Sequence, residues 1–118
     1  MLFRSGAVIA APSAALASTA APVHQAGAAV AKIHQVPCRS WTFNVYHGPL
    51  NRPTCYEGLG TIRTAIPNVH TITTGENAGV FSIRIGHVLM PVRFRPHQSL
   101  HYPPAEHAEL LGIDITHT

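Results

Sequence analysis

The chain has 118 residues, of which 11% are charged and 7% aromatic, and its formal net charge at pH 7 is +3. A chain of this length accommodates one domain, and the burial of so small a core is only marginally stabilising. The net charge is too low, and the arginines too dispersed, to indicate a nucleic-acid partner.

The first 31 residues have the layout of a secretory signal peptide. A single positive charge, Arg4, precedes an apolar run of small residues, and two small-x-small sites end at Ala20 and Ala31. Prolines interrupt the run and its alanines are weakly hydrophobic, so it would be a poor transmembrane helix. We expect cleavage after Ala20 or Ala31 and a secreted protein without a membrane span. An Ala-rich tail without order, or a transit peptide, is the alternative interpretation.

The two cysteines, Cys38 and Cys55, follow this leader. Because export leads to an oxidising compartment, we expect them to form a disulfide. The bond would close a loop of about 18 residues and stabilise the fold by about 3 kcal/mol. The alternatives are a catalytic thiol and a zinc site, but cysteine zinc sites usually contain Cys-x(2–4)-Cys pairs, and the chain has none.

Residues 36–118 form one compositional block and are predicted to be a single domain. Short β-branched runs alternate with Gly, Pro and Asn, which is typical of an all-β protein, here an antiparallel β-sandwich. The predicted strands are 40–46, 54–56, 61–66, 68–73, 80–85, 88–94 and 111–116. The only predicted helical turn is 105–111, after a pair of prolines.

Alternation within the strands assigns side chains to faces. Trp41, Phe43 and Val45 are expected on the buried face of the first strand, because side chains two residues apart share a face. The same rule places Val69 and Ile72 on opposite faces of their strand. The aromatic side chains are expected to supply much of the core.

The order of several short motifs carries a family resemblance. They are Cys38, Trp41-Thr42-Phe43-Asn44-Val45, Cys55-Tyr56-Glu57-Gly58-Leu59-Gly60, Val69, Thr74-Gly75-Glu76-Asn77-Ala78-Gly79 and Phe81. In this order the chain resembles the βγ-crystallin family, and most of all its small secreted bacterial members with killer-toxin-like domains. The resemblance implies two four-stranded Greek keys packed as a β-sandwich. It also implies that Tyr56 packs at a folded hairpin and that Gly58 takes a backbone conformation open mainly to glycine.

Many microbial members of this family bind calcium through an Asx-Asx-x-x-Ser/Thr-Ser segment. The nearest sequence here offers oxygens from Glu76 and Asn77, whereas Val80 and Phe81 stand at the hydroxyl positions. Calcium takes six to eight oxygen ligands, so these two residues are weak calcium candidates, and no other cofactor is predicted.

The sequence offers candidate residues for two further kinds of site. Among nine histidines, His97 and His101 are four residues apart and His107 follows, so a loose metal site is an alternative to surface histidines. The five carboxylates lie near turns or the carboxyl end, and no Gly-x-Ser-x-Gly motif is present, so no enzyme is predicted.

The sequence therefore predicts a secreted, monomeric, non-catalytic βγ-crystallin-like protein. The resemblance implies a growth inhibitor, or a binder of a cell-envelope component or of a target-cell protein. The alternatives are a calcium-binding structural or stress protein and a cell-wall-active enzyme. The loops around residues 75–79 are the expected binding surface, because loops on a rigid β scaffold commonly carry function.

Overall fold

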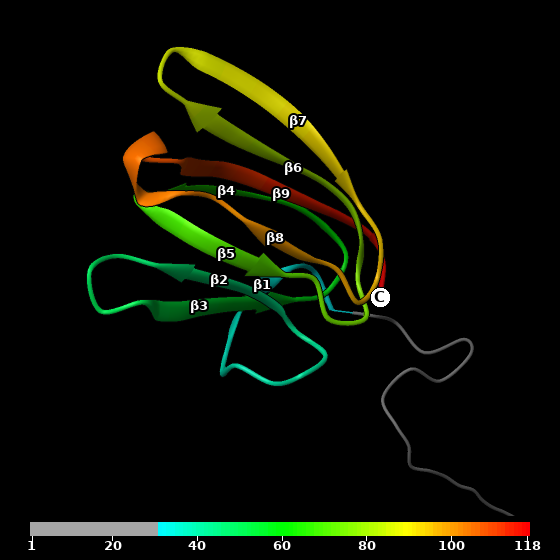
Figure 1. Ribbon diagram of the computed structural model, residues 1–118. Coiled ribbons are helices and arrows are strands. Elements are labelled where there is room, and N and C mark those ends of the chain that lie inside the picture. Colours follow the sequence, from blue (N-terminus) through cyan, green and yellow to red (C-terminus); the bar gives the residue numbers. More distant parts are fainter. Residues whose placement is uncertain (1–30) are drawn as a thin grey trace, which may run out of the picture. The chain divides into compact units, whose positions relative to one another are not determined.

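The structure is a computed structural model in which residues 31–118 are described. The predicted signal peptide lies outside the described residues, apart from Ala31. Two antiparallel sheets make up the described part of the chain (Figure 1). Within it, we find no helix with the length and apolar character needed to cross a bilayer.

The first sheet has five strands and the second has four. The first contains β1 (His34–Val36), β2 (Phe43–His47), β3 (Arg52–Glu57), β5 (Val69–Thr73) and β8 (Ser99–His101). The second contains β4 (Gly60–Ile66), β6 (Ala78–Ile85), β7 (Val88–Phe94) and β9 (Glu109–His117). The strand orders are β1-β3-β2-β5-β8 and β4-β9-β6-β7, and every neighbouring pair is antiparallel.

The two halves of the chain follow the same path through the sheets. In the first half, β2 and β3 form a hairpin, β4 crosses to the second sheet, and β5 returns beside β2. In the second half, β6 and β7 form a hairpin, β8 crosses to the first sheet, and β9 returns beside β6. Apart from β1, which adds a fifth strand to the first sheet, each sheet holds three strands of one half and the third strand of the other. The two halves therefore depend on each other to complete their sheets.

The seven predicted strands are present, and their ends shift by one to three residues; only the run at 88–94 keeps both ends. The strands β1 and β8 were not predicted, because each has three residues and pairs with a single neighbour at the edge of the sheet. The predicted helix at 105–111 is wrong beyond its first residues. A 3₁₀ turn occupies Pro104–Glu106, and the chain is already extended in β9 from Glu109.

Three phenylalanines from both sheets meet at the centre of the core. The ring centroid of Phe43 lies 6.1 Å from that of Phe81 and 5.0 Å from that of Phe94, and the latter two are 5.9 Å apart. Aliphatic side chains surround these rings, among them Val45, Val69, Ile72, Ile83, Leu110, Ile113 and Ile115. Because each ring buries a large apolar area, this cluster is the main contact that holds the two sheets together.

The prediction that Trp41 lies in the core beside Phe43 is wrong. Trp41 is 45% exposed, whereas Phe43 is fully buried. The strand begins only at Phe43, and the residues before it form a turn in which the Thr42 amide donates to the Arg39 carbonyl oxygen (3.3 Å). The alternation of faces does not extend into a turn, so Trp41 points away from the phenylalanine cluster.

The predicted faces of β5 are also wrong, because Val69 and Ile72 are both buried. Val69 pairs with His47 and Thr71 pairs with Tyr46, so the residue between them is an extra one. Such a β-bulge rotates the strand and brings two residues of opposite parity to the same face.

Tyr56 and Glu57 are the last two residues of β3, which forms a hairpin with β2. Gly58 begins the connection by which the chain leaves the first sheet for β4 in the second. The predicted glycine conformation is confirmed, since Gly58 has φ +105°. A Cβ atom there would lie 2.5 Å from the carbonyl oxygens of Ala31 and Lys32, so the close passage of the chain also requires glycine.

Candidate functional site

The predicted disulfide between Cys38 and Cys55 is confirmed. The two Cα atoms lie 5.2 Å apart, which is within the usual range for a disulfide. Cys55 is fully buried in β3, and Cys38 lies in the connection between β1 and β2. The bond therefore ties this connection to the first sheet at one fixed point.

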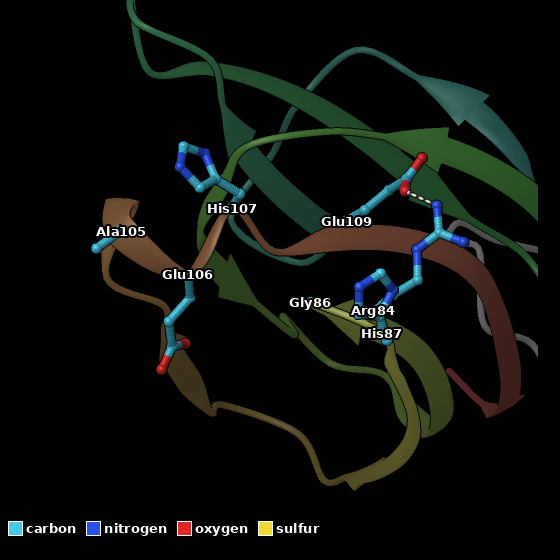
Figure 2. Close-up of a pocket in the computed structure, with 7 residues that line it drawn as sticks. All are labelled: Arg84, Gly86, His87, Ala105, Glu106, His107 and Glu109. Atoms are coloured by element: carbon cyan, nitrogen blue, oxygen red, sulfur yellow. Dashed lines mark hydrogen bonds and ion pairs between the residues drawn. The ribbon is translucent and has the colours of Figure 1, made fainter.

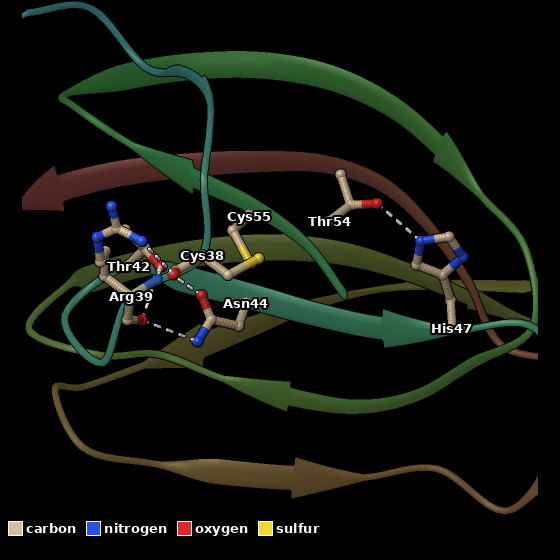
Figure 3. Close-up of a disulfide and its surroundings, with 7 residues drawn as sticks. All are labelled: Cys38, Arg39, Thr42, Asn44, His47, Thr54 and Cys55. Atoms are coloured by element: carbon tan, nitrogen blue, oxygen red, sulfur yellow. Dashed lines mark hydrogen bonds between the residues drawn. A yellow bond between two sulfur atoms is a disulfide. The ribbon is translucent and has the colours of Figure 1, made fainter. Parts of the chain in front are cut away.

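A buried polar network closes the turn that follows the disulfide (Figure 3). The Arg39 amide donates to the Thr42 hydroxyl (2.9 Å), and the Asn44 side-chain amide donates to the Arg39 carbonyl oxygen (3.2 Å). The Thr42 hydroxyl lies 2.5 Å from Asn44 Oδ1. Thr42 and Asn44 are both buried, so the bond between their side chains is shielded from water, and the two bonds to Arg39 are partly shielded. Together they hold the turn in one conformation.

The backbone of Trp41 is fixed from the other side by the corner between β5 and β6. Its carbonyl oxygen accepts hydrogen bonds from Asn77 Nδ2 (3.1 Å) and from the Glu76 amide (3.2 Å). The Asn77 amide group also donates to the Thr74 carbonyl oxygen (2.9 Å). The Trp41 side chain is thus presented to solvent from a backbone that is held on both sides.

A shallow depression of about 200 Å³ opens beside this side chain. Its lining residues are Val36, Pro37, Arg39, Trp41 and Glu57. The guanidinium group supplies hydrogen-bond donors, the carboxylate supplies acceptors, and the indole supplies an apolar face. The arrangement is suited to a ligand with both polar and apolar surface.

The prediction that residues 75–79 form an exposed binding loop is wrong. Gly75, Asn77 and Gly79 are buried and only Glu76 is exposed, because the segment carries the chain from the first sheet to the second. Of the two calcium candidates, Glu76 is exposed, and the side-chain amide nitrogen of the buried Asn77 donates to two backbone carbonyl oxygens.

The alternative metal site at His97, His101 and His107 is not formed. The backbone amide of His97 donates to the Gly75 carbonyl oxygen. The His101 ring contacts the Thr71 hydroxyl, and the His107 ring lies 3.3 Å from the Asn68 side-chain oxygen. Over residues 31–118, no three His, Cys, Asp or Glu side chains are grouped so that they could hold a metal ion.

A larger depression, of about 620 Å³, lies at the end of the β6–β7 hairpin (Figure 2). It is lined by Arg84, Gly86, His87, Ala105, Glu106, His107 and Glu109. Glu109 is bound in an ion pair with Arg84, and Figure 2 shows the two glutamates directed away from each other. A glycosidase needs two carboxyl groups across one cleft, with one of them protonated, so this geometry gives no support to a hydrolase.

The imidazole of His47 is partly buried in β2, beside the strand β3 that carries Cys55. Its Nε2 lies 2.7 Å from the Thr54 hydroxyl (Figure 3). Burial lowers the pKa of His47 from its ordinary value, and the charge of His70 lowers this pKa further. Because the unfolded chain binds this proton more readily, the neutral ring contributes stability that is complete above about pH 6.5 and is lost as the pH falls below it.

We therefore expect the free energy of unfolding to fall between pH 7.5 and pH 5, and His47→Gln to reduce that fall. Urea unfolding at both pH values measures the difference. The control is His87→Gln, since His87 is exposed and the change should leave the pH dependence as it is. Equal pH dependence in the wild type and in His47→Gln would contradict the prediction.

The alternating pattern predicts Trp41 in the core and indicates no role for Arg39. Ser40, which stands directly before Trp41, is the one local signal for the turn, because serine is common in turns. Glu57, by contrast, could not be connected with Trp41 from the sequence, because the two meet only through the pairing of β2 and β3.

Together, the fold and the site define a small all-β protein with a single disulfide and an exposed tryptophan on a fixed turn. Comparison of the chain with protein-family models, with curated proteins and with solved structures gives no match.

Proposed function

We propose that the protein is a secreted, non-catalytic βγ-crystallin-like domain that inhibits growth by binding a component of a cell envelope. The observation that carries this proposal is the disulfide between Cys38 and Cys55. Disulfides persist in oxidising compartments, where a small domain with a limited core gains most from them. The leader-like residues 1–31 support the same destination.

The path of the chain supports the family part of the proposal. In a Greek key the fourth strand returns to lie beside the first. Here β5 lies beside β2, and β9 beside β6, while the third strand of each half lies in the opposite sheet. Two such units in 88 described residues agree with the pair of Greek keys that the resemblance implies.

The test is to express the full chain in a secreting host and to analyse the medium. We expect a protein without its leader whose intact mass is lower by two hydrogens, and which slows the growth of susceptible microbial cells. Treatment with a reductant and a thiol-blocking reagent provides the control and should abolish the inhibition. A full-length product kept inside the cell with free thiols, or a secreted product without effect on growth, would refute the proposal.

The two predicted cleavage sites differ in how they would affect the contacts around Ala31. The Ala31 carbonyl oxygen accepts a hydrogen bond from the Leu59 amide (3.0 Å), and the Ile33 amide donates to the Leu59 carbonyl oxygen (2.8 Å). Ile33 is buried in the core. Cleavage after Ala20 leaves these contacts intact, whereas cleavage after Ala31 removes one of them.

We expect a chain that begins at Lys32 to be less stable by about 1 kcal/mol than one that begins at Ala21, because the Leu59 amide loses its partner. Urea unfolding of the two chains measures this difference. A third chain, which begins at Ala31, isolates the carbonyl group and should match the longer one. Equal stability of all three chains would show that Ala31 lies outside the cooperative fold.

A further inference from the structure

We propose that Trp41 is the stacking surface of a carbohydrate site, and that it binds a hexopyranose ring of an envelope glycan; only the envelope as the source of the glycan rests on the proposed function. Trp41 is the only tryptophan of the chain and is 45% exposed. Exposed single apolar residues are common, so the proposal depends on what holds and surrounds this one.

The turn that carries Trp41 is already fixed before any ligand arrives. The disulfide anchors it at Cys38, the buried Thr42 hydroxyl closes it, and Asn77 binds the Trp41 carbonyl oxygen. Binding is weakened by the cost of ordering loops and side chains, and a turn held at three points avoids most of that cost.

The side chains around the indole match the chemistry of a sugar ring. One face of a hexopyranose presents C–H groups that pack on an aromatic face, and its rim presents hydroxyls that both donate and accept hydrogen bonds. Arg39 offers donors and Glu57 offers acceptors at the same depression. With about 200 Å³, this depression is smaller than pockets that enclose drug-sized ligands, roughly 300–1,000 Å³, so it suits a single ring of a longer chain.

A protein partner fits this surface less well. A stable protein interface buries about 800 Å² on each partner and has an apolar centre. The other large hydrophobic side chains exposed in residues 31–118 are Leu50, Val88 and Leu89. Leu50 lies in the turn of the β2–β3 hairpin, and Val88 and Leu89 begin β7 beside the turn of the β6–β7 hairpin. The two hairpin turns share one end of the sheets (Figure 1), whereas Trp41 precedes β2 at the opposite end.

The intrinsic fluorescence of the secreted protein tests the proposal, because Trp41 is its only indole. The oligosaccharides used are chitotetraose, laminarihexaose, cellohexaose and mannohexaose. We expect a saturable change in emission with at least one of them, and calorimetry should give the same affinity. If none of the four changes the emission or gives heat, the proposal is overturned.

Variants separate stacking from a general effect on the fold. Trp41→Ala should weaken binding by about tenfold or more, since the stacked ring is lost, while Trp41→Tyr should retain most of it. Leu50→Ala removes a more exposed apolar side chain at the other end and should leave affinity unchanged. Arg39→Ala and Glu57→Gln, which keep the indole, should each weaken binding severalfold and serve if Trp41→Ala does not fold.

Equal affinity of Trp41→Ala and the wild type would overturn the site. If Trp41→Ala loses glycan binding but still inhibits growth, the site is supported, but the envelope glycan as its ligand in inhibition is overturned. If the wild type binds an oligosaccharide without inhibiting growth, the proposed function fails and the carbohydrate site stands. The two proposals can therefore fail independently.

Discussion

The double substitution Cys38→Ala/Cys55→Ala is expected to lower the free energy of unfolding by about 3 kcal/mol. The bond spans a sequence separation of 17. Closing a loop of this size lowers the conformational entropy of the unfolded chain, which stabilises the folded state by about 3 kcal/mol. Domains are typically stable by only about 5–15 kcal/mol, so the loss would be a large fraction of the total. Alanine is the suitable replacement because Cys55 is fully buried, where the hydroxyl of serine would lack a partner.

Urea unfolding followed by the fluorescence of Trp41 measures this change. The wild type under a reductant is the matched control and should unfold at nearly the same urea concentration as the double variant. If the reduced wild type instead keeps the midpoint of the oxidised protein, the disulfide does not stabilise the fold, and the main support for the proposed function is lost.

Gly75→Ala is expected to be as damaging as loss of the disulfide, although it adds only one methyl group. Gly75 has φ +61°, and a Cβ atom would lie 2.4 Å from the Trp41 carbonyl oxygen and 2.5 Å from that of Thr42. The left-handed backbone conformation costs a residue with a side chain about 1–2 kcal/mol. Overpacking against backbone that cannot easily move adds about 1–3 kcal/mol.

Gly86→Ala is the matched control for this prediction. Gly86 has a similar φ of +64°, but no atom lies within 4 Å of the position of its Cβ. It should therefore show only the conformational cost, and the difference in the free energy of unfolding between the two variants measures the contact with the Trp41 turn. Equal losses would mean that this turn is not packed against the corner at Gly75.

Gly75→Ala is also expected to affect the carbohydrate site. The methyl group of Gly75→Ala would push on the carbonyl group that Asn77 holds, so the variant should also bind oligosaccharide less well than Gly86→Ala does. A stabilising contact and the candidate site thus share the same corner of the molecule.

The local sequence was sufficient to predict those features of the structure that depend on neighbouring residues along the chain. The strand at Val88–Phe94 was predicted to the residue, because its β-branched residues lie between Gly86 and Pro96. The requirement for glycine at position 58 was likewise visible as a Gly between two strand-like runs. The disulfide could be inferred because there are only two cysteines and one leader-like segment.

The local sequence was not sufficient to predict those features that depend on pairing with a segment far along the chain. The bulge at His70 arises from the pairing of β5 with β2, and it alone brings Val69 to the buried face. The strands β1 and β8 form by pairing with the edge of a sheet, and a pattern of three residues cannot predict such a pairing.

The class of the fold and the pairing of the cysteines could be read from the chain, because periodicity, turn residues and the count of thiols are properties of the sequence. The site could not be read in this way. Trp41 is exposed because the first strand starts three residues later than predicted, and Asn77, from a corner 36 residues further on, secures its backbone. Packing between distant segments decides which aromatic side chains are buried, and here the core contains three phenylalanines and Tyr56, whereas the indole of Trp41 is 45% exposed.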